Sequence, residues 1–190
     1  NSDVFDKTIV STEDDEIASV AKNHGATVPF TRPEELATDT AQVVDVLDHV
    51  LKQYEARDEE ITELGVLFPT APLRTAKDVR NAYEKFTAHD ASFLMSVTDY
   101  TYSPVQALAE EDGFLTPYWD NMEAVNSRSQ DQADLVVSNG AIYFIEVNAY
   151  KEQRTFYGDS LIGYRMPRKR SVDIDEQFDF EFAEFLLQRR

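Results

Sequence analysis

The chain has 190 residues and no cysteine. The absence of thiols excludes disulfide bridges and metal sites built on thiolates. No apolar run approaches the roughly 18 residues that a membrane-spanning helix needs, and the polar, acidic N-terminal residues do not resemble a signal peptide. We therefore expect no membrane association and, without an export signal, a cytoplasmic location.

Basic side chains are scarce relative to acidic ones. Lys and Arg number 18 against 36 Asp and Glu, which gives a formal net charge of −18 at pH 7. A surface of this sign disfavours binding to nucleic acid, because phosphate backbones require basic partners. An anionic substrate must instead be met by a local group of Arg and Lys, so such groups are informative in this chain.

Apolar side chains, in contrast, are plentiful enough for a core. They make up 42% of the residues, aromatic ones make up 12%, and the length fits one domain over residues 1–190. Segments of strand character alternate with segments of helical period, which predicts an α/β fold with a mostly parallel, doubly wound sheet. The expected strands are 7–11, 26–30, 64–68, 92–97, 135–137, 141–145 and 160–165, and the expected helices include those that follow Thr12, Asp39, Thr75 and Asp175.

The alternating pattern stops in residues 102–134, where turn formers and aromatic residues replace it. We expect an irregular projecting arm with short antiparallel strands. Exposed aromatic side chains on such an arm usually mark a partner surface. The sequence therefore predicts that the arm helps to build a homodimer.

Two carboxylates near the C-terminus, Asp173 and Asp175, flank Ile174. In an extended strand, alternate side chains point to the same face, so both carboxylates could address one hard cation while Ile174 enters the core. A basic run, Arg168 to Arg170, precedes them and could hold an anion. The alternatives are that the basic run is a solvated surface and that Asp175 is the N-cap of the last helix.

Several short segments, in this order and spacing, resemble the acylneuraminate cytidylyltransferase family, whose members make CMP-activated sialic acids. The resemblance covers essentially the whole chain. The segments that carry it are Val10–Ile17, Arg32–Asp39, Pro69–Arg74, Arg128–Asp131, Asn139–Tyr143 and Ser171–Asp175.

This resemblance implies a nucleotide-diphospho-sugar transferase-like, Rossmann-like fold. It implies transfer of CMP from CTP to the anomeric hydroxyl of a sialic-acid-like nonulosonic acid, with release of pyrophosphate and with Mg²⁺ as cofactor. Asp173 and Asp175 match the family's catalytic, metal-holding pair. The expected nucleotide-binding residues are Arg32, Arg74 and Thr70, and the expected sugar-acid-binding residues are Gln106, Arg128, Gln130 and Asn139.

Structural roles remain open for some of these residues. Arg32 and Arg74 could satisfy a nearby carboxylate or helix, and Asn139-Gly140 is also a typical hairpin turn. The sugar is open too. Ala71 stands where the family has Ser, which resembles the pseudaminic acid branch, whereas Asn139–Tyr143 resembles the sialic or legionaminic branch. A cytidylyltransferase for an eight-carbon keto acid is a further alternative.

The family's first strand and its phosphate loop, of the type Ala-Arg-Gly-Gly-Ser-Lys, have no counterpart in this sequence. We therefore expect that the chain lacks N-terminal residues of its native form, and that as given it has poor or no transferase activity. The alternative from another functional class is a non-catalytic remnant of the fold that acts as a dimer partner.

Overall fold

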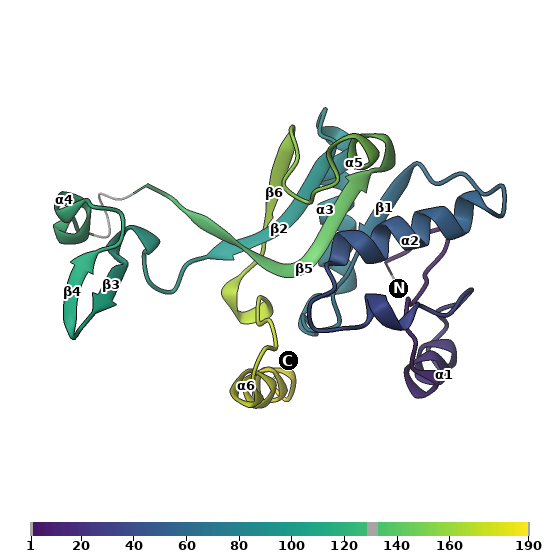
Figure 1. The fold of residues 1–190 in the computed structure, drawn as a ribbon, viewed down its shortest axis with the longest axis horizontal. Coiled ribbons are helices and arrows are strands. Elements are labelled where there is room, and N and C mark those ends of the chain that lie inside the picture. The colour runs from purple at the N-terminus through teal and green to yellow at the C-terminus, as the bar shows by residue number, and fades with distance from the viewer. Residues whose placement is uncertain (1, 129–132, 190) are drawn as a thin grey trace. The chain divides into compact units, whose positions relative to one another are not determined.

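The computed structural model describes residues 2–128 and 133–189 (Figure 1). The chain divides into two compact units, which are described separately. Unit 1 comprises residues 1–67, 75–95 and 142–163, and unit 2 comprises residues 68–74, 96–141 and 164–190.

The elements alternate between helix and strand, which confirms the α/β class. In chain order they are α1 (Asp15–Asn23), η1 (Glu34–Leu36), α2 (Val43–Glu55), β1 (Glu63–Val66), α3 (Ala76–Ala88), β2 (Phe93–Asp99), η2 (Pro104–Gln106), β3 (Leu108–Glu111), β4 (Phe114–Pro117), α4 (Met122–Asn126), β5 (Val136–Glu146), α5 (Val147–Gln153), β6 (Leu161–Arg165), η4 (Arg168–Arg170) and α6 (Gln177–Leu187). The main sheet has the order β1-β5-β2-β6. Its β1–β5 pair is antiparallel, with Leu64 opposite Ile145, so this edge departs from the parallel arrangement.

Strand β5 carries apolar side chains toward both faces of the sheet in unit 1. On one face, Ile145 joins a cluster formed by Leu47, Leu51, Phe93, Val147 and Tyr150, from α2, β2 and α5. On the other face, Phe144 stacks against Phe86 of α3 and against Phe5, with ring centroids 6.0 Å apart in both pairs. Packing on both faces explains why residues 141–145 of this strand are all apolar.

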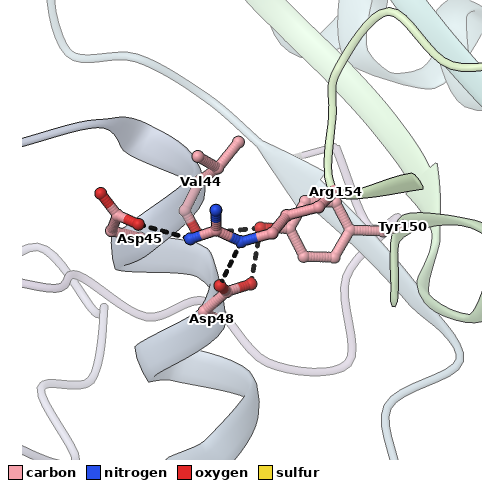
Figure 2. A network of polar contacts seen from close by, with 5 residues as sticks. All are labelled: Val44, Asp45, Asp48, Tyr150 and Arg154. Atoms are coloured by element: carbon pink, nitrogen blue, oxygen red, sulfur yellow. Dashed lines mark hydrogen bonds and ion pairs between the residues drawn. The ribbon is translucent and has the colours of Figure 1, made fainter. Parts of the chain in front are cut away.

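Polar contacts also join α2 to α5 (Figure 2). The Tyr150 hydroxyl lies 2.8 Å from the carbonyl oxygen of Val44 and 2.9 Å from Oδ1 of Asp48, and these two acceptors share its single donor hydrogen. Arg154, at the left-handed C-cap of α5, pairs with Asp48 and with Asp45. Burial, reinforced by the bond to Asp48, raises the pKa of Tyr150, so the hydroxyl remains a donor.

The first predicted strands shrink to a single parallel bridge between Ile9 and Thr27. The prediction that Thr12 begins α1 is also wrong. Asp14 is the N-cap and accepts from the amide of Ile17, while the Thr12 hydroxyl accepts from the amide of Asp14. Both candidates are good caps by residue type, and only the backbone geometry selects one.

The start of α3 matches its prediction, because Thr75 and Asp78 form a reciprocal capping box. The segment around Asn139-Gly140 does not. The expected strands 135–137 and 141–145 are one continuous strand, β5, and the dipeptide lies inside it rather than in a hairpin turn. Gly140 has a φ of +66°, so the strand is locally distorted there without reversing.

The arm contains the predicted antiparallel strands. β3 and β4 pair with Leu108 opposite Pro117. Asp112 and Gly113 join them, both with positive φ (50° and 80°), as a tight hairpin requires. The short helix α4 was not expected from the sequence.

Helix α6 follows Asp175 as expected, and only part of its apolar surface packs against the core. Phe178, Phe182 and Phe185 are exposed, whereas Ala183 and Leu186 contact the core. The helix carries large apolar side chains of its own on several faces, so the period of its sequence does not identify the face that is buried. None of the described helices is long and apolar enough to cross a bilayer.

Candidate active site

Two of the predicted site segments lie side by side in unit 2. The amide of Ile174 donates to the carbonyl of Thr70 at 2.9 Å, which joins the turn 69–74 to the acidic segment 171–175. Leu73, fully buried, packs with Val172 and Ala183, and Ile174 packs against this cluster. Packing of the apolar residues in the two segments thus keeps the turn 69–74 next to the acidic segment 171–175.

The acidic segment does not form the strand that its alternation suggested. Strand β6 ends at Arg165, and the turn η4 intervenes before Ser171. Ile174 nevertheless packs against the core, as expected. Asp175 is exposed but is not the N-cap of α6; that position belongs to Glu176, in a reciprocal capping box with Asp179.

Asp173 is partly buried, and its Oδ1 is fully buried without a hydrogen-bond partner among the described residues. Its other oxygen, Oδ2, lies against Gly140 so closely that a Cβ there would stand 2.8 Å away. A buried carboxylate oxygen without a partner is costly unless something binds it.

This carboxylate fits a hard cation, since Mg²⁺ is usually held by one or two carboxylates together with water and substrate oxygens. Asp173 and Asp175 are the residues that would hold it. Within the described residues no group of three or more His, Cys, Asp and Glu could form a fuller metal cage.

Arg74 organises the turn in which it lies. Its Nη1 donates to the carbonyls of Phe68 at 2.6 Å and Ala71 at 2.8 Å. Burial lowers the pKa of its guanidinium, and among the described residues no carboxylate pairs with it. A partly buried cation that meets only neutral carbonyls favours the approach of an anion.

Ala71 is fully buried. The methyl group that replaces the family's serine hydroxyl therefore belongs to the core of this chain.

Asn139 is buried, with 4% of its surface exposed, and protein groups satisfy its amide. Oδ1 accepts from Ser96 Oγ at 2.6 Å and from the amide of Ala141, while Nδ2 donates to Ser171 Oγ at 2.8 Å and to the sulfur of Met166.

Arg32 lies in unit 1 and pairs with Glu13 through Nε and Nη2. The hydrogen bond from Arg32 holds the pKa of Glu13 below its ordinary value. Pairing with a nearby carboxylate is the structural alternative that the sequence left open for Arg32. The Nε and Nη2 groups that bind Glu13 are also the ones that a phosphate would need.

The remaining predicted residues lie on the arm. Gln106 and Arg128 are exposed, and Gln106 donates to the carbonyl of Val125. Among the described residues, no hydrogen bond or ion pair joins either one to Asn139. Gln130 lies outside the described residues.

The basic run is mostly solvated. Arg168 donates to Thr101 Oγ1 at 2.7 Å, and Lys169 is exposed. Arg165, just before this run, was not singled out from the sequence. It forms a bidentate pair with Asp134 and a further pair with Asp99, where the chain leaves β2 for the arm and returns to β5.

Ser96, Gly140 and Ser171 are parts of this site that the sequence did not reveal. The sequence offered one indication, because Ser96 follows three apolar residues in a buried strand and a hydroxyl at such a position needs a partner. The residues near Ser96 in the sequence do not indicate that its partner is Asn139, which lies 43 residues away.

The fold has a counterpart among solved structures. The CMP:2-keto-3-deoxy-manno-octonic acid synthetase, complexed with CTP, superposes with a TM-score of 0.61 over 96% of this chain and 81% of that one, at 12% identity. The likeness defines the class of the fold, the nucleotide-sugar transferase-like α/β proteins. The family follows from sequence: a profile of the cytidylyltransferases matches residues 1–190, and the chain belongs to that family.

Curated relatives are similar over nearly all of this chain. The pseudaminic acid cytidylyltransferase of Campylobacter jejuni is 31% identical over 99% of this chain and 81% of its own length. The N-acylneuraminate cytidylyltransferase of Escherichia coli is 28% identical over 100% of this chain and 44% of its own. Both relatives are enzymes by name, in agreement with the predicted transferase class.

Proposed function

We propose that the protein transfers CMP from CTP to the anomeric hydroxyl of a nonulosonic acid. The hydroxyl oxygen bonds to the α-phosphorus of CTP, the bond from that phosphorus to the bridging oxygen breaks, and pyrophosphate leaves while the hydroxyl proton passes to solvent. Relatives named for pseudaminic acid and for N-acylneuraminate support this substrate class.

One observation carries the proposal: the buried Oδ1 of Asp173 has no partner among the described residues, in a segment hydrogen-bonded to the Thr70 turn. Asp173 and Asp175 would hold Mg²⁺, which when bound would neutralise charge on the triphosphate. Arg74 would attract the nucleotide phosphates through its carbonyl-bound guanidinium.

In this proposal, residues of the arm select the sugar acid. Gln106 and Arg128 are exposed. Arg128 would pair with the carboxylate of the sugar acid, from the neighbouring subunit if the arms exchange. Gln130 remains a predicted sugar-binding residue from the resemblance. Asn139 was predicted with it, but protein groups take up the hydrogen bonds of its amide.

The proposed homodimer is supported by exposed aromatic side chains on the arm. Phe114, Tyr118 and Trp119 expose 77%, 62% and 60% of their surface. Clusters of this kind on a projecting element usually mark a protein interface. A mass of twice the chain by light scattering supports the dimer, and a monomer at micromolar concentration contradicts it.

The function is tested by pyrophosphate release from CTP by the complete product of the encoding gene. The panel of acceptors contains N-acetylneuraminic, legionaminic and pseudaminic acids and the eight-carbon 3-deoxy-manno-octulosonic acid. We expect Mg²⁺-dependent release with at least one nine-carbon acid. Release with the eight-carbon acid alone contradicts the proposed substrate class, and no release with any acid favours the non-catalytic alternative.

A further inference from the structure

Asn139 connects three parts of unit 2 through one side chain. It reaches Ser96 in β2 through Oδ1, and Ser171 and Met166 in the segment after β6 through Nδ2. An amide has two donor hydrogens and one acceptor oxygen with two lone pairs, and all of this capacity is used here. The side chain is therefore a structural junction, with no polar atom left over for a ligand.

Ser171 is the end of this junction that lies nearest the acidic pair, two residues before Asp173. Its Oγ accepts from Asn139 and donates to the carbonyl of Pro167 at 3.0 Å. The residue before that proline, Met166, is itself fixed, because its amide donates to Val97 at 2.8 Å and its carbonyl accepts from Thr98. The start of the acidic segment is thus tied to β2 and to β5.

Gly140, in β5, lies directly against the Asp173 carboxylate. Its φ of +66° suits glycine, and the missing side chain leaves the space that the Asp173 carboxylate occupies. A Cβ at this position would stand 2.8 Å from Oδ2 and 3.4 Å from Cγ. The carboxylate could not keep its place beside an alanine.

We propose that Asn139 and Gly140 are positioning residues that fix the Asp173 carboxylate for its cation: Asn139 holds the Ser171 end of the segment, and Gly140 makes room for the carboxylate. The inference rests on the proposed function, since it takes Asp173 as a metal ligand. It assigns Asn139 a role behind the site rather than in contact with the sugar acid.

Groups that orient a metal ligand typically change metal affinity by about 10- to 100-fold when they are removed. The test therefore measures Mn²⁺ binding without nucleotide, through the electron paramagnetic resonance signal of the free ion, on the complete gene product. Ser171→Ala and Gly140→Ala should each weaken Mn²⁺ binding about tenfold or more. Ser171→Thr, which keeps the hydroxyl, should bind as the unchanged protein does.

Two controls separate the possible failures. Ser103→Ala, at a serine whose side chain caps nothing, should leave Mn²⁺ affinity unchanged. Asp173→Asn reports on the proposed function itself. If Asp173→Asn abolishes binding while Ser171→Ala and Gly140→Ala bind normally, the positioning role is wrong and the metal role stands; if Asp173→Asn binds normally, the metal role is wrong.

A purely structural role is excluded by comparing stability with affinity. Melting temperatures are recorded for every variant, and affinity is compared at a temperature where all of them are folded. Loss of stability with unchanged Mn²⁺ affinity overturns the inference. Loss of affinity in Ser171→Ala, restored in Ser171→Thr, supports it.

Discussion

Tyr150 places a hydroxyl at the edge of an otherwise apolar cluster in unit 1, and only 1% of its surface is exposed. Its hydroxyl meets a carbonyl and a carboxylate of α2 at once (Figure 2). Hydrogen bonds to a charged partner in such places contribute more than those between neutral groups.

Tyr150→Phe keeps the ring and removes only the hydroxyl. The Asp48 carboxylate and the Val44 carbonyl then lose a donor, and we expect a loss of about 1–2 kcal/mol in the free energy of unfolding. Urea denaturation measures it. The matched control is Tyr157→Phe, at a tyrosine that is 69% exposed. Equal, negligible effects in both variants would contradict the role given to the buried hydroxyl.

The role of a single residue could be predicted when its partner lies close to it in the sequence. Thr75 and Asp78 are three positions apart, and their capping box follows from sequence alone. Asn139 finds its partners 43 and 32 residues away, so only the folded chain reveals its junction role. The nearest local signal, the dipeptide Asn139-Gly140, indicated a hairpin instead.

Among the elements, the arm has a defined attachment. Arg165 at the end of β6 binds Asp99 at the end of β2 and Asp134 just before β5. The hydrogen bond to Arg165 holds the pKa of the Asp134 carboxyl below its ordinary value of 3.8. This ionic attachment is exposed, so salt screens it.

Arg165→Gln should loosen the attachment without unfolding either unit. We expect faster hydrogen exchange at the amides near Asp99 and Val136, and little change in Lys169→Gln, where an exposed lysine nearby is replaced. Equal exchange in both variants would contradict the role of Arg165.

The same attachment predicts a pH dependence. Because the folded-state pKa of Asp134 is lowered, its stabilising contribution is complete above pH 3.8 and is lost as the pH falls through the lower folded value. Exchange at these amides, corrected for its intrinsic pH dependence, should therefore rise only in acid.

Element types were easier to predict than element faces. The apolar period of α2 and the two-sided burial of the central strands are strong local patterns. Helix α6 has phenylalanine at 178, 180, 182 and 185, so its period selects no single face. The apolar sequences of β1 and β5 are typical of strands in a parallel sheet, yet the two strands pair antiparallel. The composition of a strand does not determine its direction.

At the scale of the whole molecule, the excess of acidic residues explains why several arginines pair with carboxylates. The net charge is −18, and Arg32, Arg154 and Arg165 are bound to carboxylates. Arg74 instead meets carbonyls beside the acidic segment, which is consistent with a place for an anionic substrate. The sequence predicted the fold class and the family, whereas the arrangement behind Asp173 required the structure.

The most direct test of the central claim is the rate of Mg²⁺-dependent pyrophosphate release by Asp173→Asn in the complete gene product, with CTP and the preferred sugar acid. Asp90→Asn, at an exposed aspartate after α3, is the matched control. Removal of a carboxylate ligand costs several kcal/mol of charge stabilisation, so we predict a rate at least about 100-fold lower for Asp173→Asn and an unchanged rate for Asp90→Asn. An Asp173→Asn enzyme with normal rate and normal Mg²⁺ dependence would contradict the account.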